Sequence, residues 1–196
     1  GELAAIGGTA AATLNILGVG ATVTLSPSSD LVVGHATSGT ATINLLDGGA
    51  LTVGTGGTTN VLGTGTIYLD AGTADLRALS VVGGAINVNG GKLSFTTLSV
   101  SGGAINFSAG RIEQSNNLTA DESLLTTLLG PAHTLASGRT LAAGGGIATL
   151  SANLELNGGR LEGNSLIVTN AGPNATVLRA RNGGTAQFAG GATLTA

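Results

Sequence analysis

Ser80-Val81-Val82-Gly83-Gly84-Ala85-Ile86-Asn87-Val88 is followed by a second copy, Ser99-Val100-Ser101-Gly102-Gly103-Ala104-Ile105-Asn106-Phe107. The two copies align without a gap, and the difference between Ser99 and Ser80 gives a period of 19 residues. A period this short does not suit a pair of helices, but it suits one coil of a β-solenoid. The repeat therefore predicts an elongated stack of β-coils and not a globule built around a pocket.

A further pair of similar segments supports this interpretation. The segment Gly90–Val100 matches Gly158–Val168 at every Gly-Gly, basic, Leu and Val position. In a parallel stack each residue lies about 4.8 Å above its counterpart in the coil below, so like residues recur from coil to coil. Hairpin folds have no such requirement. The sequence thus predicts an all-β, parallel β-solenoid.

Ile-Asn pairs recur within these segments, as Ile86-Asn87, Ile105-Asn106 and, further upstream, Ile43-Asn44. We predict that Ile86 and Ile105 stack as an internal ladder. Asn87 and Asn106 would then pass amide hydrogen bonds from one coil to the next at a corner. The alternative is that each asparagine is present only because it tolerates a turn.

The composition of the 196 residues fits a single solenoid domain covering 1–196. Glycine is abundant (35 residues), Phe, Tyr and Trp make up 2% and charged residues 9% of the chain. The mean hydropathy of +0.41 argues against disorder. The scarcity of aromatic residues predicts a narrow core without room for large rings.

One segment departs from the strand pattern. Thr119-Ala120-Asp121-Glu122 reads as a capping box in which Thr119 and Glu122 cap a helix, and Gly130-Pro131 reads as its end. Leucines between these signals fall on one helical face. We predict a short helix near residues 120–129, outside the stack or plugging one end. The alternative is an irregular coil whose leucines point inward.

Charge and hydropathy argue against nucleic-acid binding and against membrane insertion. The net charge is −3, Lys92 is the only lysine and the arginines are scattered, so no basic field is predicted for phosphate binding. The uncharged run from Leu3 to Leu25 is interrupted by glycines and alternates with threonines, which is a strand pattern and not a membrane helix.

The sequence offers few candidates for catalysis. His35 and His133 both follow loop-like residues and are expected to be solvated, and neither has zinc-ligand spacing. There is no cysteine and no nucleophile elbow. Asp70 and Asp75 would form at most a weak cation site. We therefore predict no catalytic, cofactor-binding or metal-binding residues, and no enzyme.

The segments Gly83–Leu93 and Leu154–Leu161 resemble the autotransporter-associated β-strand repeats of large bacterial surface proteins. The resemblance covers residues 40–170. It implies a right-handed parallel β-helix exported to the cell exterior or cell surface. It implies no catalytic residues.

These observations favour an extracellular structural or adhesive protein that associates with itself into a fibre or surface layer. No polar cap is evident at either end of the sequence, so either the protein continues or open β edges join subunits. One alternative is a carbohydrate-binding or polysaccharide-cleaving β-helix, for which a surface polysaccharide would be the partner. Another is an autotransporter passenger stalk that displays a different domain.

Overall fold

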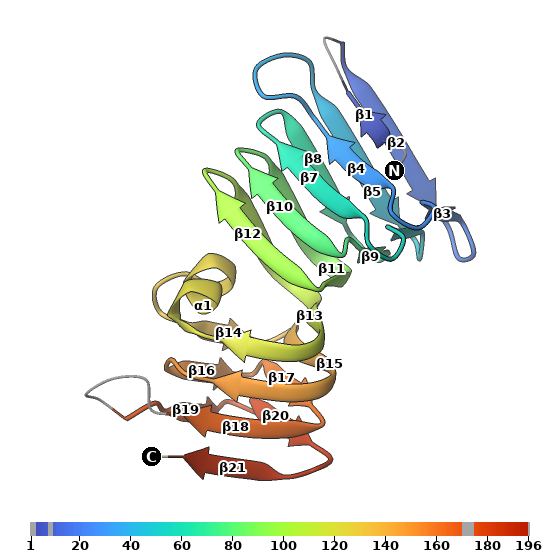
Figure 1. Ribbon diagram of the computed structural model, residues 1–196. Coiled ribbons are helices and arrows are strands. Elements are labelled where there is room, and N and C mark those ends of the chain that lie inside the picture. The colour runs from blue at the N-terminus through green and yellow to red at the C-terminus, as the bar shows by residue number, and fades with distance from the viewer. Residues whose placement is uncertain (1–2, 8–9, 170–174, 196) are drawn as a thin grey trace. The chain divides into compact units, whose positions relative to one another are not determined.

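The computed structural model describes residues 3–7, 10–169 and 175–195. The chain divides into two compact units, Gly1–Gly110 and Arg111–Ala196. Both units consist of short strands that are stacked coil upon coil (Figure 1). Each unit is described separately below.

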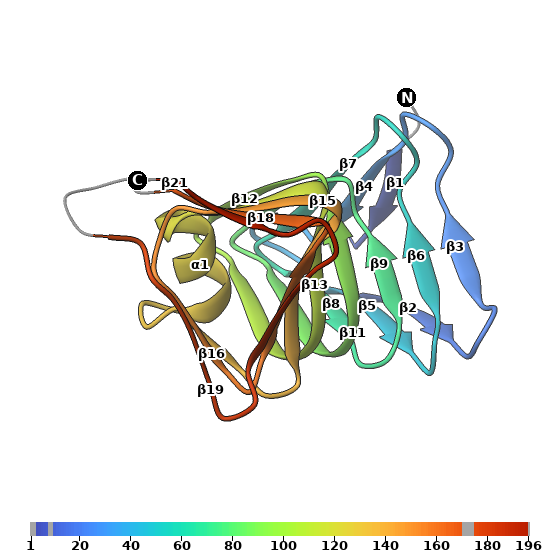
Figure 2. The same cartoon turned by 90° about the horizontal axis from the view of Figure 1, so that it is seen from below.

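Unit 1 consists of successive coils with up to three strands each. In chain order its strands are β1 (Leu3–Ile6), β2 (Ala12–Leu17), β3 (Thr22–Thr24), β4 (Asp30–Val33), β5 (Ala41–Leu46), β6 (Ala50–Thr52), β7 (Thr58–Leu62), β8 (Gly65–Leu69), β9 (Thr73–Asp75), β10 (Ala78–Val82), β11 (Ala85–Phe95), β12 (Thr97–Ser101) and the first part of β13 (Ala104–Ala120). One row of strands has the order β1-β4-β7-β10-β12, and a second has β2-β5-β8-β11. The third row, with β3, β6 and β9 side by side, is clearest in Figure 2.

The ladders within these rows are parallel, as the repeat predicts. Ser80 of β10 lies opposite Ser99 of β12, so the 19-residue period seen in the sequence is the length of one coil. Likewise, Ile86 of β11 lies opposite Ile67 of β8, which lies opposite Ile43 of β5. The prediction of an all-β fold of stacked parallel strands is confirmed.

Unit 2 repeats this arrangement. Its elements are the second part of β13, α1 (Glu122–Leu129), β14 (Thr134–Ala136), β15 (Arg139–Leu150), β16 (Leu154–Asn157), β17 (Arg160–Gly163), β18 (Ser165–Thr169), β19 (Leu178–Arg181), β20 (Thr185–Phe188) and β21 (Ala192–Thr195). β14, β16 and β19 form one parallel row; β15 pairs with both β17 and β18, which pair in turn with β20 and β21. Figure 2 looks along this stack, and the coils of unit 2 superpose in that view.

Each unit has a core of aliphatic side chains that point inward from alternate strand positions. Leu93 of β11 and Leu161 of β17, which occupy the same place in the two matching segments, are both buried. Phe95 and Phe107 are buried as well. The prediction that large aromatic rings do not fit this core is therefore wrong, because the interior accommodates a ring where neighbouring positions are aliphatic.

Coil length varies along unit 1 even though the ladders stay in register. Ala85 lies above Thr66, which is one 19-residue period, but Ala41 lies above Ala12, which is 29 residues away. The extra residues leave the stack as loops, such as residues 34–40 between β4 and β5. A clear sequence repeat is therefore confined to coils with short corners.

Glycines form columns at two corners of unit 1, with successive members 19 residues apart. One column contains Gly65, Gly84 and Gly103, and the other contains Gly72, Gly91 and Gly110. A Cβ on Gly72 would lie 2.5 Å from the carbonyl oxygen of Gly49 in the preceding coil. Glycine is required because the backbones of successive coils approach closely at these corners. The Gly-Gly pairs of the repeat are the sequence signature of these two columns.

Helix α1 confirms the predicted helix and its end, but not its cap. The N-cap is Asp121, whose Oδ1 accepts a hydrogen bond from the backbone N–H of Leu124 at 2.8 Å. Thr119 lies in β13, two residues before the N-cap, and Glu122 is the first helical residue. The predicted capping box of Thr119 and Glu122 is therefore wrong. The carboxylates of Asp121 and Glu122 complement the partial positive charge at the N-terminus of the helix, and no threonine cap is needed.

The end of α1 lies where the sequence predicts it. Gly130 is the C-cap with φ of 77°, a conformation that glycine adopts without strain. Leu125 and Leu128 are buried. Figure 1 shows α1 beside β14, and Figure 2, which looks along the stack, shows α1 within the outline of the unit 2 coils.

Candidate functional site

In the predicted ladder, the two isoleucine side chains point inward and the two asparagine side chains point outward. Ile86 and Ile105 are buried, and Asn106 Nδ2 donates to Asn87 Oδ1 at 2.9 Å. Asn87 lies within β11 and Asn106 within β13, so neither is a turn residue and the amides meet on a strand face and not at a corner.

Asparagine pairs occur elsewhere on the outer faces. Asn44 Nδ2 donates to Asn15 Oδ1 at 2.7 Å in unit 1, and Asn182 Nδ2 donates to Asn157 Oδ1 at 2.6 Å in unit 2. Tyr68 lies between Asn44 and Asn87 in register and separates the two pairs of unit 1. The amides therefore link adjacent coils pairwise.

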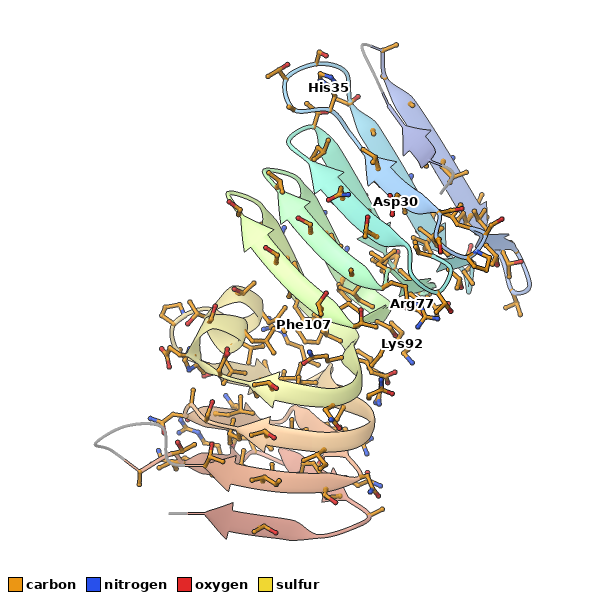
Figure 3. All side chains as sticks on the ribbon, in the orientation of Figure 1. Asp30, His35, Arg77, Lys92 and Phe107 are labelled. Carbon is orange, nitrogen blue, oxygen red and sulfur yellow. The ribbon has the colours of Figure 1, made fainter. Side chains whose placement is uncertain are left out.

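The two histidines lie in different environments. His35 is exposed in the loop of residues 34–40, as expected (Figure 3). His133 is buried, so the prediction that it is solvated is wrong. Its Nε2 lies 2.9 Å from Thr126 Oγ1 of α1 and its Nδ1 lies 3.1 Å from the carbonyl oxygen of Asn153. A φ of 45° at His133 brings the ring into this position after the turn at Gly130. His133 thus ties α1 to the neighbouring coil.

Replacing His133 with alanine is expected to lower the free energy of unfolding by about 2 kcal/mol, because a buried hydrogen-bonding group is removed and its partners lose their bonds. His35→Ala is the matched control, since an exposed substitution changes stability by about 0.5 kcal/mol or less. Urea unfolding followed by circular dichroism measures both. Equal effects of the two substitutions would contradict the assigned role of His133.

Asp70 and Asp75 do not form a cation site with other carboxylates. Asp70 is exposed in the turn after β8. Asp75 ends β9, and its Oδ2 lies 3.4 Å from Nη2 of Arg77. Across residues 3–7, 10–169 and 175–195, no three His, Cys, Asp or Glu side chains gather as metal ligands.

A polar network on the outer face of unit 2 is the strongest candidate site. Arg111 Nε donates to Glu113 Oε2 at 2.9 Å, and Arg111 Nη1 donates to Glu162 Oε2. The other oxygen of Glu162 lies 3.1 Å from Arg160 Nη2. The same Nη2 donates to Gln187 Oε1 at 2.6 Å. Residues from β13, β17 and β20 are therefore connected by charge and hydrogen bonds.

The stacking of coils explains why these side chains meet. Glu162 lies opposite Ala142 of β15 on one side and opposite Gln187 of β20 on the other. The order of strands is β13-β15-β17-β20. Because Ala142 is small, Arg111 on β13 reaches across β15 to the carboxylate of Glu162.

The electrostatics of Arg111 agree with this geometry. Burial lowers the pKa of Arg111, but its hydrogen bonds to Glu162 and Glu113 outweigh burial, so the pKa stands above its ordinary value. The guanidinium is held in place by two carboxylates and stays charged. The network is thus ordered before any ligand arrives.

A cavity of about 550 Å³ adjoins the network. Arg111, Arg160, Glu162, Gln187 and Asn164 supply its polar lining, and the rest is small: Ala143, Gly145, Gly163 and Ala189. We call this cavity with its polar lining the lateral groove. It offers donors and acceptors on one wall and little steric bulk elsewhere.

The lateral groove was not predicted, because the arginines that line it are scattered along the sequence. A signal was present: a basic residue directly follows a corner glycine at Lys92, Arg111 and Arg160. Two residues later, on the same strand face, stand Ser94, Glu113 and Glu162. Aligning coils on their glycines would have stacked the basic and acidic positions.

No helix in the described part of the chain is long and apolar enough to cross a membrane. Comparison with known proteins gave no family model, no curated protein and no solved structure that matches the chain.

Proposed function

We propose that this chain is a structural and adhesive β-solenoid that acts at the bacterial cell exterior and associates with itself into a fibre or surface layer. The observation that supports this proposal best is the in-register parallel stack, in which each coil is a template for the next. Backbone hydrogen bonds along the stack give stiffness, and further coils can extend it without a change of structure. The proposed location comes from the resemblance to surface-protein repeats.

Within these 196 residues, the first coil of unit 1 presents an edge for such association. Among the described strands, β1, β2 and β3 each pair on one side only. Ala12 and Gly18 donate their backbone N–H groups to the coil of β5. N–H groups of the alternate residues, Thr13 and Leu17 among them, face the other side. An edge of this kind can pair with a strand of a second copy.

The sequence around this edge has no charged residue from Leu3 to Leu25, and Leu17 and Val19 are exposed. Little electrostatic repulsion opposes the approach of a second copy. Natural edge strands that avoid pairing commonly carry lysine, which this edge lacks. We therefore place the contact between copies at β2 and its flanking turns.

Electron microscopy and sedimentation of the purified 196-residue chain test the proposal. We expect filaments or large assemblies, and we expect the double substitution Thr13→Lys with Leu17→Lys to leave monomers. Ala36→Lys with Thr37→Lys adds the same charge to the exposed loop of residues 34–40 and should assemble like the wild type. A wild-type chain that sediments only as a monomer, or an edge variant that assembles equally well, would refute self-association.

A further inference from the structure

The lateral groove is a second feature of the surface, and self-association does not use it. The edge proposed for contact between copies belongs to unit 1, whereas the groove is lined by residues of unit 2. Its polar side chains come from strands β13, β17 and β20 and from Asn164, between β17 and β18, so its shape depends on the stacked register of several coils. A site fixed by rigid strands is suited to binding with little ordering cost.

The charges of the groove indicate which ligands it accepts. Arg111 is paired with Glu113 and Glu162, and Arg160 is paired with Glu162. Because each guanidinium already faces a carboxylate, neither a free anion nor a free cation finds an uncompensated charge. This balance of charge favours a ligand without net charge over an ion.

The hydrogen-bonding groups of the groove restrict the class of ligand further. Arg160 is about half exposed and uses Nη2 for both Glu162 and Gln187, so its remaining N–H donors are directed elsewhere. Gln187 and Asn164 add side-chain amides that both donate and accept. Planar groups with closely spaced donors and acceptors match vicinal hydroxyls, each of which is a donor and an acceptor.

The remainder of the groove suits a ring. Ala143, Gly145 and Gly163 leave the surface free of bulky side chains. The C–H face of a pyranose is apolar, and its edge is polar.

We propose that the lateral groove binds the neutral sugar units of a polysaccharide. Arg160, Gln187 and Asn164 contact the hydroxyls, and Arg111 with Glu113 and Glu162 holds Arg160 in position. The proposal names a ligand class for the adhesive role but does not depend on assembly into fibres.

Calorimetric titration of the full chain with neutral hexaoses of β-1,4-glucan, β-1,4-mannan, β-1,4-xylan and α-1,4-glucan tests this proposal. We expect at least one to bind with a Kd of about 1 mM or below. Arg160→Ala should weaken that binding about tenfold or more, since a charged donor is lost. Arg181→Ala is the matched control, because Arg181 is equally exposed and also pairs with a glutamate, Glu155.

Absence of binding to all four hexaoses would overturn the inference, as would equal weakening by Arg160→Ala and Arg181→Ala. Tetragalacturonate serves as the anionic comparison. Tighter binding of that acid than of every neutral hexaose would also overturn it, because the charge balance of the groove would not be selecting the ligand. Failure of self-association would leave these expectations unchanged, so the two proposals fail separately.

Discussion

Replacing Gly72 with alanine is expected to lower the free energy of unfolding by about 3 kcal/mol, the upper range for an added methyl that the structure cannot accommodate. The new Cβ would lie 2.5 Å from the carbonyl oxygen of Gly49 and 2.6 Å from the Cβ of Leu45. Neither neighbour is the flexible end of a side chain. Relief of the overlap therefore requires two coils to move apart, which weakens their ladder hydrogen bonds.

Gly102→Ala is the control for this substitution. Gly102 lies in the same unit with φ of 68°, and a Cβ there would meet no atom within 4 Å. Its cost is limited to backbone strain of about 1 kcal/mol. Chemical denaturation of both variants separates close coil packing from conformational preference. If Gly72→Ala were no more destabilising than Gly102→Ala, the glycine columns would not be set by the approach of successive backbones.

Phe95→Ala is expected to have the largest effect of any substitution considered, about 4 kcal/mol, because it removes a fully buried ring and leaves a cavity. Phe95 is 1% exposed at the end of β11 and is the largest of the fully buried side chains. The coils are held by backbone ladders on each side, so they cannot close around the space.

Tyr68→Ala tests whether the effect comes from burial and not from loss of an aromatic ring as such. Tyr68 is 40% exposed on the outer face of β8. We expect a loss of about 1 kcal/mol or less, since most surface substitutions have small effects. Thermal unfolding of the two variants gives the comparison, and a Tyr68 variant as unstable as the Phe95 variant would contradict the assigned core.

The parts of the fold that the sequence predicts are those set by local repetition. Ser80 and Ser99, one period apart, lie opposite each other in parallel strands. Asn87 and Asn106 are hydrogen-bonded as expected, because identical residues at equal positions of equal coils must superpose. The end of α1 at Gly130 was also predictable, since a C-cap with positive φ favours glycine strongly.

The parts that could not be predicted depend on register between coils of unequal length. Arg111 and Glu162 are 51 residues apart, and their pairing requires the lengths of the coils between them. The burial of His133 depends on one positive φ in a turn, which its sequence neighbourhood does not specify. The N-cap is Asp121 and not the predicted Thr119, because several neighbouring polar residues are each able to cap a helix.

The unequal lengths of the corners between strands have a practical consequence. β4 and β5 keep their places in the ladders of unit 1 although residues 34–40 leave the stack between them. Loop closure becomes only slowly more costly as a loop lengthens. A foreign peptide grafted into residues 34–40 would thus be displayed to solvent on a rigid scaffold, and several such chains would present an epitope at regular intervals.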